Sequence, residues 1–274
     1  MAATTVATLE ELTRRAIDGD GDALDSLVRG IQGDVYGLAL RMLWNRANAE
    51  DATQEILVRV VTRLSQFDFR SRVKTWIYRV AVNYLLDMKK SPVERMHLTF
   101  EQFAEDLADG LSDEGPNETE RSVLIDEVKI GCAMGMLQCL DREHRLAYVL
   151  GEILELTGPE AAEVLDIAPA LFRKRLQHAR EGLLAFTREH CGLVSDTAQC
   201  HCNRRVPAAL RLGRVRADAF EFGRAAISFH EAREVVRQID EARRAFALHR
   251  VDPRMSTVDF AQHVMQALDR HSEQ

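Results

Sequence analysis

The 274-residue sequence lacks the features that mark a secreted or a membrane-spanning protein. No apolar run approaches the roughly 20 residues that a membrane-spanning helix needs. The first residues, MAATTVATLEELTRR, contain no cationic start, apolar core or small-residue cleavage site of a secretory signal. We therefore expect a cytoplasmic protein with no membrane partner.

The sequence also lacks the short motifs of common catalytic sites. It contains no Gly-rich phosphate loop, no His-x-x-x-His pair and no nucleophile with an evident base. A redox centre built from clustered cysteines is the best remaining form of an enzyme. We predict that the chain is not an enzyme.

Positive charge is in deficit, with 36 lysines and arginines against 43 aspartates and glutamates and a net charge of −7. A protein that coats nucleic acid without selectivity needs the opposite balance. Any contact with nucleic acid must therefore come from local basic patches.

Proline and alternating β-type runs are scarce. The chain has only six prolines, and its apolar residues recur three and four positions apart. This periodicity predicts an all-α protein. No internal repeat of solenoid length is present.

Two amphipathic segments dominate the first 90 residues. The segment AEDATQEILVRVVTRLSQF (49–67) places carboxylates ahead of an apolar stripe that includes Ile56 and Val60. The segment FRSRVKTWIYRVAVNYLLDMKK (69–90) predicts a basic helix with interleaved aromatic residues and an inner stripe that includes Ile77.

An acidic stretch follows, SPVERMHLTFEQFAEDLADGLSDEGPNETE (91–120), with Gly-Pro, two turn clusters and weak periodicity. This composition predicts an extended linker. The chain then divides into a first helical domain, the acidic linker, a second helical domain and a C-terminal extension, with boundaries at 1–92, 93–120, 121–190 and 191–274.

The segment LTGPEAAEVLDIAPALFRKRLQHAREGLLAF (156–186) has the pattern of a helix-turn-helix. Thr157 and Glu160 form a capping-box pattern, and Pro169 suits the first turn of the second helix. The inner stripe of that helix is predicted to be Phe172, Leu176, Ala179 and Leu183. Its outward residues are predicted to be Arg173, Lys174, Gln177, His178 and Arg180.

These three segments, in this order and separated by an acidic linker, resemble the extracytoplasmic-function (ECF) sigma factors of the sigma-70 family. The resemblance covers about residues 10–190. It implies a transcription initiation factor with two helical domains that binds promoter DNA. It also implies binding to the largest and second-largest subunits of core RNA polymerase.

The resemblance also implies roles for individual residues. The polymerase-binding residues would be Asp51, Gln54 and Glu55. The residues at the −10 element, where cations, an aromatic face and an amide are needed, would be Lys74, Trp76, Arg79 and Asn83. The residues at the −35 element would be Arg173, Lys174, Gln177, His178 and Arg180.

Other interpretations remain open for these residues. The carboxylates near Asp51 are compatible with a solvated helix start, Trp76 with a buried anchor, and the outward cations with a solvated basic face. Asp166 replaces the usual glycine of the turn and can adopt left-handed geometry, whereas Ala168 replaces a hydroxyl cap and cannot cap. A stand-alone helix-turn-helix regulator with a thiol redox switch is the main rival.

Three of the five cysteines lie in CGLVSDTAQCHC (191–202), a polar, turn-rich stretch. Cys200 and Cys202 can turn their sulfurs to the same side of an extended chain, and Cys191 can return across the loop as a third ligand. Soft sulfur ligands suit zinc, copper(I) or cadmium. A fourth ligand is predicted to be His201, with His190 and His230 as alternatives, and a reversible disulfide remains open. The other two cysteines, Cys132 and Cys139, lie seven residues apart on a predicted apolar helix and are expected in the hydrophobic core.

The extension beyond residue 190 resembles the cysteine-rich C-terminal domain of CorE-like, metal-responsive ECF sigma factors, which need no separate anti-sigma protein. The resemblance implies that zinc or copper at Cys191, Cys200, Cys202 and His201 controls how the extension packs. The extension is expected to form a small packed module, with one helix opened by a Ser228–Glu231 capping box and a last helix carrying Phe260, Val264 and Leu268.

Overall fold

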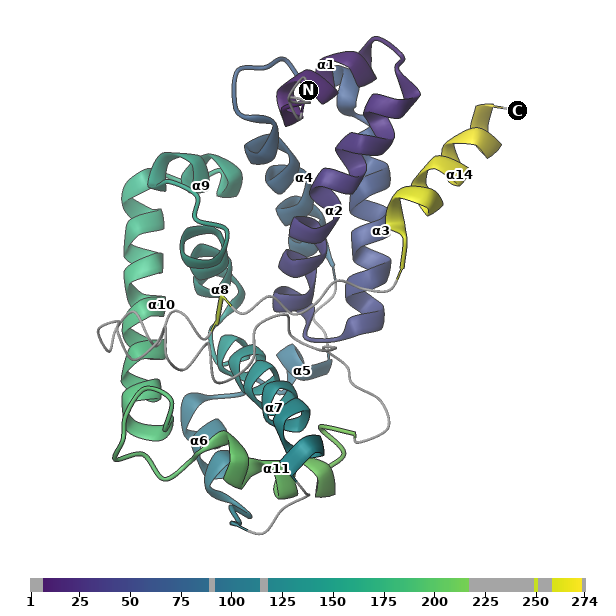
Figure 1. Cartoon of the computed structure of the whole chain (residues 1–274). Coiled ribbons are helices and arrows are strands. Elements are labelled where there is room, and N and C mark those ends of the chain that lie inside the picture. Colours follow the sequence, from purple (N-terminus) through teal and green to yellow (C-terminus); the bar gives the residue numbers. More distant parts are fainter. Residues whose placement is uncertain (1–6, 89–91, 114–117, 217–248, 251–257, 273–274) are drawn as a thin grey trace, which may run out of the picture. The chain divides into compact units, whose positions relative to one another are not determined.

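The protein is built from α-helices, as its periodicity predicts. The computed structural model describes residues 7–88, 92–113, 118–216, 249–250 and 258–272 (Figure 1). The elements are α1 (Leu9–Ile17), α2 (Gly21–Leu43), α3 (Arg46–Thr62), the short 3-10 helix η1 (Leu64–Gln66), α4 (Val73–Asp87), α5 (Pro92–Arg95), α6 (Phe100–Ala108), α7 (Glu118–Gln138), α8 (Arg142–Tyr148), the π-helical segment η2 (Val149–Ile153), α9 (Gly158–Leu165), α10 (Pro169–His190), α11 (Cys202–Arg211) and α14 (Phe260–Ser272).

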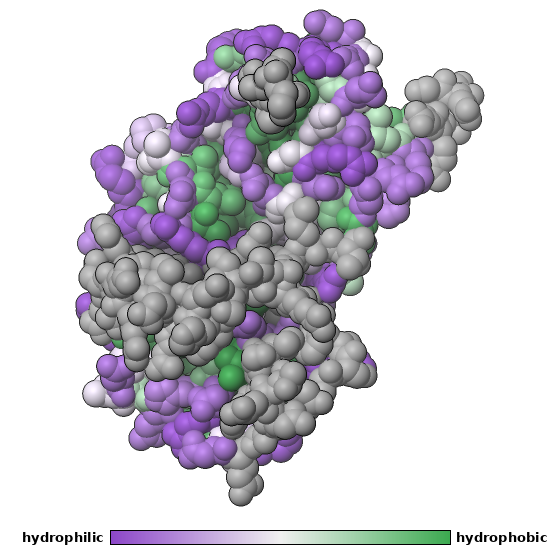
Figure 2. Space-filling model, viewed as in Figure 1, coloured by the Kyte–Doolittle hydropathy of each residue, from purple (hydrophilic) through white to green (hydrophobic). Residues whose placement is uncertain are grey.

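Within those ranges no β-strand is present, and the bridge between Cys191 and Cys200 is an isolated parallel pair. No helix in the described part of the chain is both long and apolar enough to cross a membrane. On the face drawn in Figure 2, most of the coloured surface is hydrophilic, with hydrophobic patches between the hydrophilic residues.

The chain forms two compact units that do not follow the order of the sequence. The first unit comprises residues 1–89, 157–169 and 255–274, and the second comprises residues 90–156 and 170–254. The residues expected to form the first helix of the helix-turn-helix therefore group with the N-terminal helices.

The first unit has its core between α2, α3 and α4, which lie side by side (Figure 1). Leu27, Ile31, Ile56, Val60 and Ile77 are all buried there, which confirms the predicted inner stripes of α3 and α4. The ends of these helices follow from local sequence.

Polar side chains begin the first helices of this unit. The Thr8 hydroxyl and Glu11 form a reciprocal capping box at α1. The carboxylate of Asp20 accepts the amide of Ala23 at α2, and the side chain of Asn45 accepts the amide of Asn48 at α3. Because these caps satisfy amides that have no partner within the helix, they fix where each helix begins.

The acidic linker is not extended throughout, so that part of the prediction is wrong. Helix α6 forms within it, opened by a capping box between Thr99 and Gln102. Phe103 and Leu107 lie one turn apart and are buried, and the Phe103 ring lies 5.6 Å from that of Phe186 on α10. The acidic composition concealed a short amphipathic helix.

A buried ion-pair cluster joins the linker to the second helical domain. Glu94 receives hydrogen bonds from Arg142 at 2.7 and 2.8 Å and from Arg145 at 3.2 Å. The side chain of Arg145 is only 2% exposed and also donates to the carbonyls of Leu137 and Leu140. Because a buried guanidinium needs such partners, this cluster fixes how the linker enters the unit.

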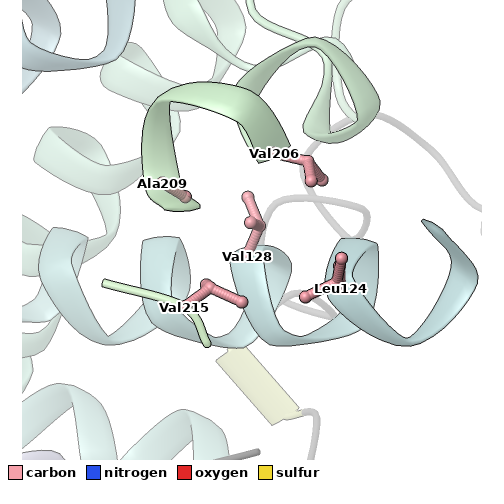
Figure 3. Close-up of a cluster of buried hydrophobic side chains, with 5 residues drawn as sticks. All are labelled: Leu124, Val128, Val206, Ala209 and Val215. Carbon is pink, nitrogen blue, oxygen red and sulfur yellow. The ribbon is translucent and has the colours of Figure 1, made fainter. Parts of the chain in front are cut away.

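The described helices of the extension do not pack together as one module, contrary to expectation. Helix α11 belongs to the second unit, where Val206, Ala209 and Val215 face Leu124 and Val128 of α7 (Figure 3). Helix α14 belongs to the first unit. The helix predicted after Ser228 lies outside the described residues.

Helix α14 packs against α2 and α3 within the first unit. Phe260 and Val264 are buried as predicted, while Leu268 is half-buried. The Phe260 ring lies 6.0 Å from the ring of Tyr36, and Asp259 pairs with Arg29 at 3.2 Å. The two described helices of the extension, α11 and α14, thus pack their apolar stripes within different units.

Candidate functional site

The predicted polymerase-binding residues lie together on an exposed face of α3. Asp51, Gln54 and Glu55 are all exposed, because Ala52, Thr53 and Ile56 take the inward positions. Glu55 pairs with Arg59 at 3.0 Å, and the Arg59 guanidinium lies 4.5 Å from the centre of the Tyr84 ring. The predicted polymerase-binding residues therefore present two carboxylates and one amide on this face of α3.

The predicted −10 residues are distributed around α4 with different degrees of exposure. Lys74 is exposed and its ammonium lies 2.8 Å from the carboxylate of Asp34 on α2. Asn83 is exposed. Trp76 is half-buried, with its ring 5.4 Å from that of Phe67, so its indole is partly a packing group and partly accessible.

Two arginines, Arg72 directly before α4 and Arg79 within it, contact α9, which belongs to the same unit. Arg79 donates to the backbone carbonyl of Glu163 at 2.9 and 3.1 Å and to its carboxylate at 3.2 Å. Arg72 pairs with Glu160 at 3.2 Å. Arg79 is thus engaged by a protein carboxylate in this arrangement.

The turn between α9 and α10 has the predicted local geometry. Thr157 and Glu160 form the capping box, and Asp166 adopts left-handed geometry with φ of 52°. Pro169 is the first residue of α10, where its missing amide hydrogen leaves no bond unmade.

On α10 all five predicted outward residues are exposed, and Phe172, Leu176, Ala179 and Leu183 are all buried. Arg180 is committed to the carboxylate of Glu152, to which its Nε donates at 2.7 Å. Gln177 donates to Glu181 at 2.8 Å, and the His178 ring lies 4.7 Å from that of His144. Two outward cations, Arg173 and Lys174, have no ion-pair partner in the described part of the chain.

Close packing sets the position of α10 in its unit. A Cβ atom placed on Gly151 of η2 would lie 2.9 Å from the side chain of Leu176 and 3.3 Å from that of Phe172. Glycine at this position therefore lets α10 approach the π-helical segment more closely than any other residue would allow.

Four of the five cysteines line one cavity of about 30 Å³ within the second unit, a space for about one water molecule. They are Cys132 from α7, Cys191 after α10, Cys200, and Cys202 at the start of α11. Apolar side chains complete much of the wall, and two cations, Lys129 and Arg205, also line it. The sequence prediction brought three of these cysteines together and missed Cys132.

Gly192 permits the close approach that brings Cys191 beside Cys200. Its amide donates to the carbonyl of Cys200 at 2.9 Å. A Cβ atom on Gly192 would lie 2.4 Å from Nδ1 of His201, so the imidazole lies against this glycine. His201 is absent from the residues that line the cavity, and the ring of His190 lies 4.9 Å from that of Phe186.

All five cysteines are free thiols in the structure. Burial raises the pKa of Cys132 to about 12 and that of Cys200 to about 11, and neighbouring thiols raise both further. Burial likewise raises the pKa of Cys191 and Cys202. Among the described residues, no three His, Cys, Asp or Glu side chains are arranged to hold a metal ion. The cavity therefore gathers four free cysteines with the donor chemistry, but not the closed geometry, of a metal centre.

Sequence reasoning missed the polar residues that hold the cavity in place. Arg205 is 2% exposed and donates to the carbonyl of Asp109 at 2.6 Å and to the carboxylate of Asp106 at 3.0 Å. The carboxylate of Asp106 also accepts from Arg214. The arginines of the segment after the cysteines were visible in the sequence, but their partners on α6 were not.

Comparison with known proteins identifies the family of the chain. Residues 27–92 match sigma-70 region 2. The chain is 30% identical over 197 residues to the ECF RNA polymerase sigma factor SigE of Mycolicibacterium smegmatis, an alignment covering 69% of this chain and 72% of SigE. It is 29% identical over 173 residues to the ECF RNA polymerase sigma factor SigW of Bacillus subtilis, covering 60% and 89% of the two chains.

A solved structure, that of CnrH in complex with the cytosolic domain of CnrY, aligns with a TM-score of 0.43 and 23% identity over 64% of this chain and 93% of that chain. The match to region 2 and the identity to SigE over most of its length lead to one conclusion: the chain belongs to the ECF RNA polymerase sigma factors.

Proposed function

We propose that this chain, as a transcription initiation factor of the ECF family, binds core RNA polymerase through α3 and promoter DNA through α4 and α10. Family membership makes it a non-enzymatic protein, in line with the absence of catalytic motifs. The observation that carries the proposal is that the assigned residues of α3 and α10, and Lys74 and Asn83 of α4, are exposed on helices whose other faces are buried.

The chemistry of each face supports its assigned partner. Asp51 and Glu55 offer carboxylates one helical turn apart, suited to orienting an arginine-rich polymerase surface. Arg173 and Lys174 offer unpaired cations at the start of α10, suited to phosphates and base edges in a major groove. Lys74 and Asn83 offer a cation and an amide for a melted strand.

The C-terminal extension is proposed to do the work of an anti-sigma protein within the same chain. The packing of Phe260 and Val264 on α2 and α3 supports this role, because α3 also carries the polymerase-binding carboxylates. The donor set of the thiol cavity fits a thiophilic ion, zinc or copper(I), bound by Cys191, Cys200 and Cys202, with His201 as a further candidate. Ion binding would then set how the extension packs.

The test is transcription in vitro from promoter fragments with core RNA polymerase and the full-length chain, with zinc, copper(I) or a chelator. We expect promoter-selective initiation that needs both the chain and core enzyme and that responds to metal. Selective DNA binding by the chain alone, with no association with core enzyme, would support the stand-alone regulator instead and defeat the proposal.

A further inference from the structure

From the geometry of the thiol cavity we infer that Cys132 of α7 is the fourth ligand of a tetrathiolate site for a divalent, thiophilic ion, completed by Cys191, Cys200 and Cys202. The inference rests on the proposed metal control of the extension and goes beyond it by naming a ligand inside the second helical domain. Cys132 takes the place of His201 as the fourth ligand, because the His201 ring lies against Gly192 and does not line the cavity.

The positions of the four sulfur-bearing residues support this assignment. Cys191 and Cys200 are paired in a backbone bridge, and Cys202 follows two residues later. His201 lies between Cys200 and Cys202 in the sequence, but its ring lies against Gly192 and does not line the cavity. Cys132 reaches the same cavity from a different helix. Four thiolates form one of the closed ligand sets of structural zinc, whereas three leave an open position.

The surroundings of the cavity suit a charged thiolate cluster. A divalent ion with four thiolates carries two net negative charges. Two cations line the same cavity: Lys129, which also pairs with Asp126 at 2.8 Å, and Arg205, which also pairs with Asp106 at 3.0 Å. Apolar side chains of Leu107, Val128, Met136 and Phe186 exclude water from the remaining wall.

Closure on an ion requires the four side chains to turn toward a common point, since the thiols are not yet arranged as ligands. Such rotation is within the freedom of side chains that already share a cavity. Its result would be a cross-link between α7 and the segment that begins the extension. Metal would thereby fix the extension to the domain that carries α10.

Cys139 provides a matched control, because it lies directly after the end of the helix that carries Cys132. It lies seven residues after Cys132, is also half-buried, and directs its thiol to the carbonyls of Gly135 at 3.5 Å and Thr99 at 3.6 Å. It does not line the cavity. Cys132→Ser and Cys139→Ser therefore make the same chemical change at sites with different predicted roles.

The experiment is titration of the full-length, reduced chain with Cd²⁺, reading the thiolate-to-cadmium charge-transfer absorption per bound ion. We expect four thiolates per ion in the wild type and in Cys139→Ser, and three in Cys132→Ser with affinity weakened at least ~10-fold. Three thiolates in the wild type, or no effect of Cys132→Ser, overturns the inference and leaves the proposed metal control standing. No binding by the wild type overturns both.

A measurement on the wild-type chain guards against a variant that fails to fold. The rate of alkylation of each cysteine, followed by peptide mass spectrometry, is compared with and without Zn²⁺. We expect Zn²⁺ to slow modification of Cys132 together with Cys191, Cys200 and Cys202, and to leave Cys139 unchanged. Protection of the three extension cysteines without Cys132 overturns the inference.

Discussion

Replacing Phe260 with alanine should release α14 from α2 and α3 and raise affinity for core RNA polymerase. Phe260 is 3% exposed and is the largest side chain in the buried stripe of α14. Truncation of a buried phenylalanine to alanine costs about 3–5 kcal/mol. Since 1.4 kcal/mol corresponds to a factor of ten, the docking equilibrium of α14 should fall by at least about 100-fold.

Hydrogen exchange of the α14 amides measures that docking directly. We expect the amides of α14 to exchange faster in Phe260→Ala, with the core of α2 around Leu27 and Ile31 remaining protected because those residues are buried by α3 and α4 as well. Gln262→Ala, at an exposed position of α14, is the control and should exchange as the wild type does. The reasoning is refuted if α14 exchanges no faster in Phe260→Ala, or if polymerase affinity falls.

Three further outcomes follow from the described contacts. Replacing Arg173 and Lys174 together with alanine should weaken promoter binding and lower its dependence on salt, measured by titration at several salt concentrations, because each cation has a phosphate to neutralise. Glu94→Gln should lower the free energy of unfolding by about 3–5 kcal/mol in urea, because it leaves the guanidinium of Arg145 buried without its carboxylate. Burial raises the pKa of Asp106, but the hydrogen bond and charge of its arginine partners outweigh that effect and leave the pKa below its ordinary value. The contribution of Asp106 to the free energy of unfolding should therefore be complete above the ordinary pKa of an aspartate and should be lost as the pH falls below that value. Urea unfolding at several pH values should show this loss in the wild type and should no longer show it in Asp106→Asn.

Features set by neighbours in the sequence could be predicted. The capping box of Thr157, the left-handed turn at Asp166 and the stripe that includes Phe172 all depend on residues within two helical turns. The exposure of Asp51 on α3 followed from the same periodicity. For these segments, the spacing of apolar residues and the capping residues were sufficient to predict the local structure.

Features set by contacts distant in the sequence could not be predicted. Cys132 and Cys139 looked equivalent by their spacing in the sequence, although α7 ends at Gln138, and only the fold brings the first of them to the cavity with Cys200. The destination of Phe260 was equally hidden, because an apolar stripe predicts burial without naming the partner. Helix α6 was missed because its charged residues outweighed the pair formed by Phe103 and Leu107.

The docking of α14 on the helices of region 2 has a consequence for how gene expression would scale with protein copy number. An inhibitor on a separate chain must be made in proportion to its target, and dilution weakens its hold. A covalently attached helix is present at one copy per sigma factor, and its effective concentration is set by the tether, not by the cell's supply. The fraction of released molecules would then stay constant as expression rises, so that the response to a signal would be independent of dose.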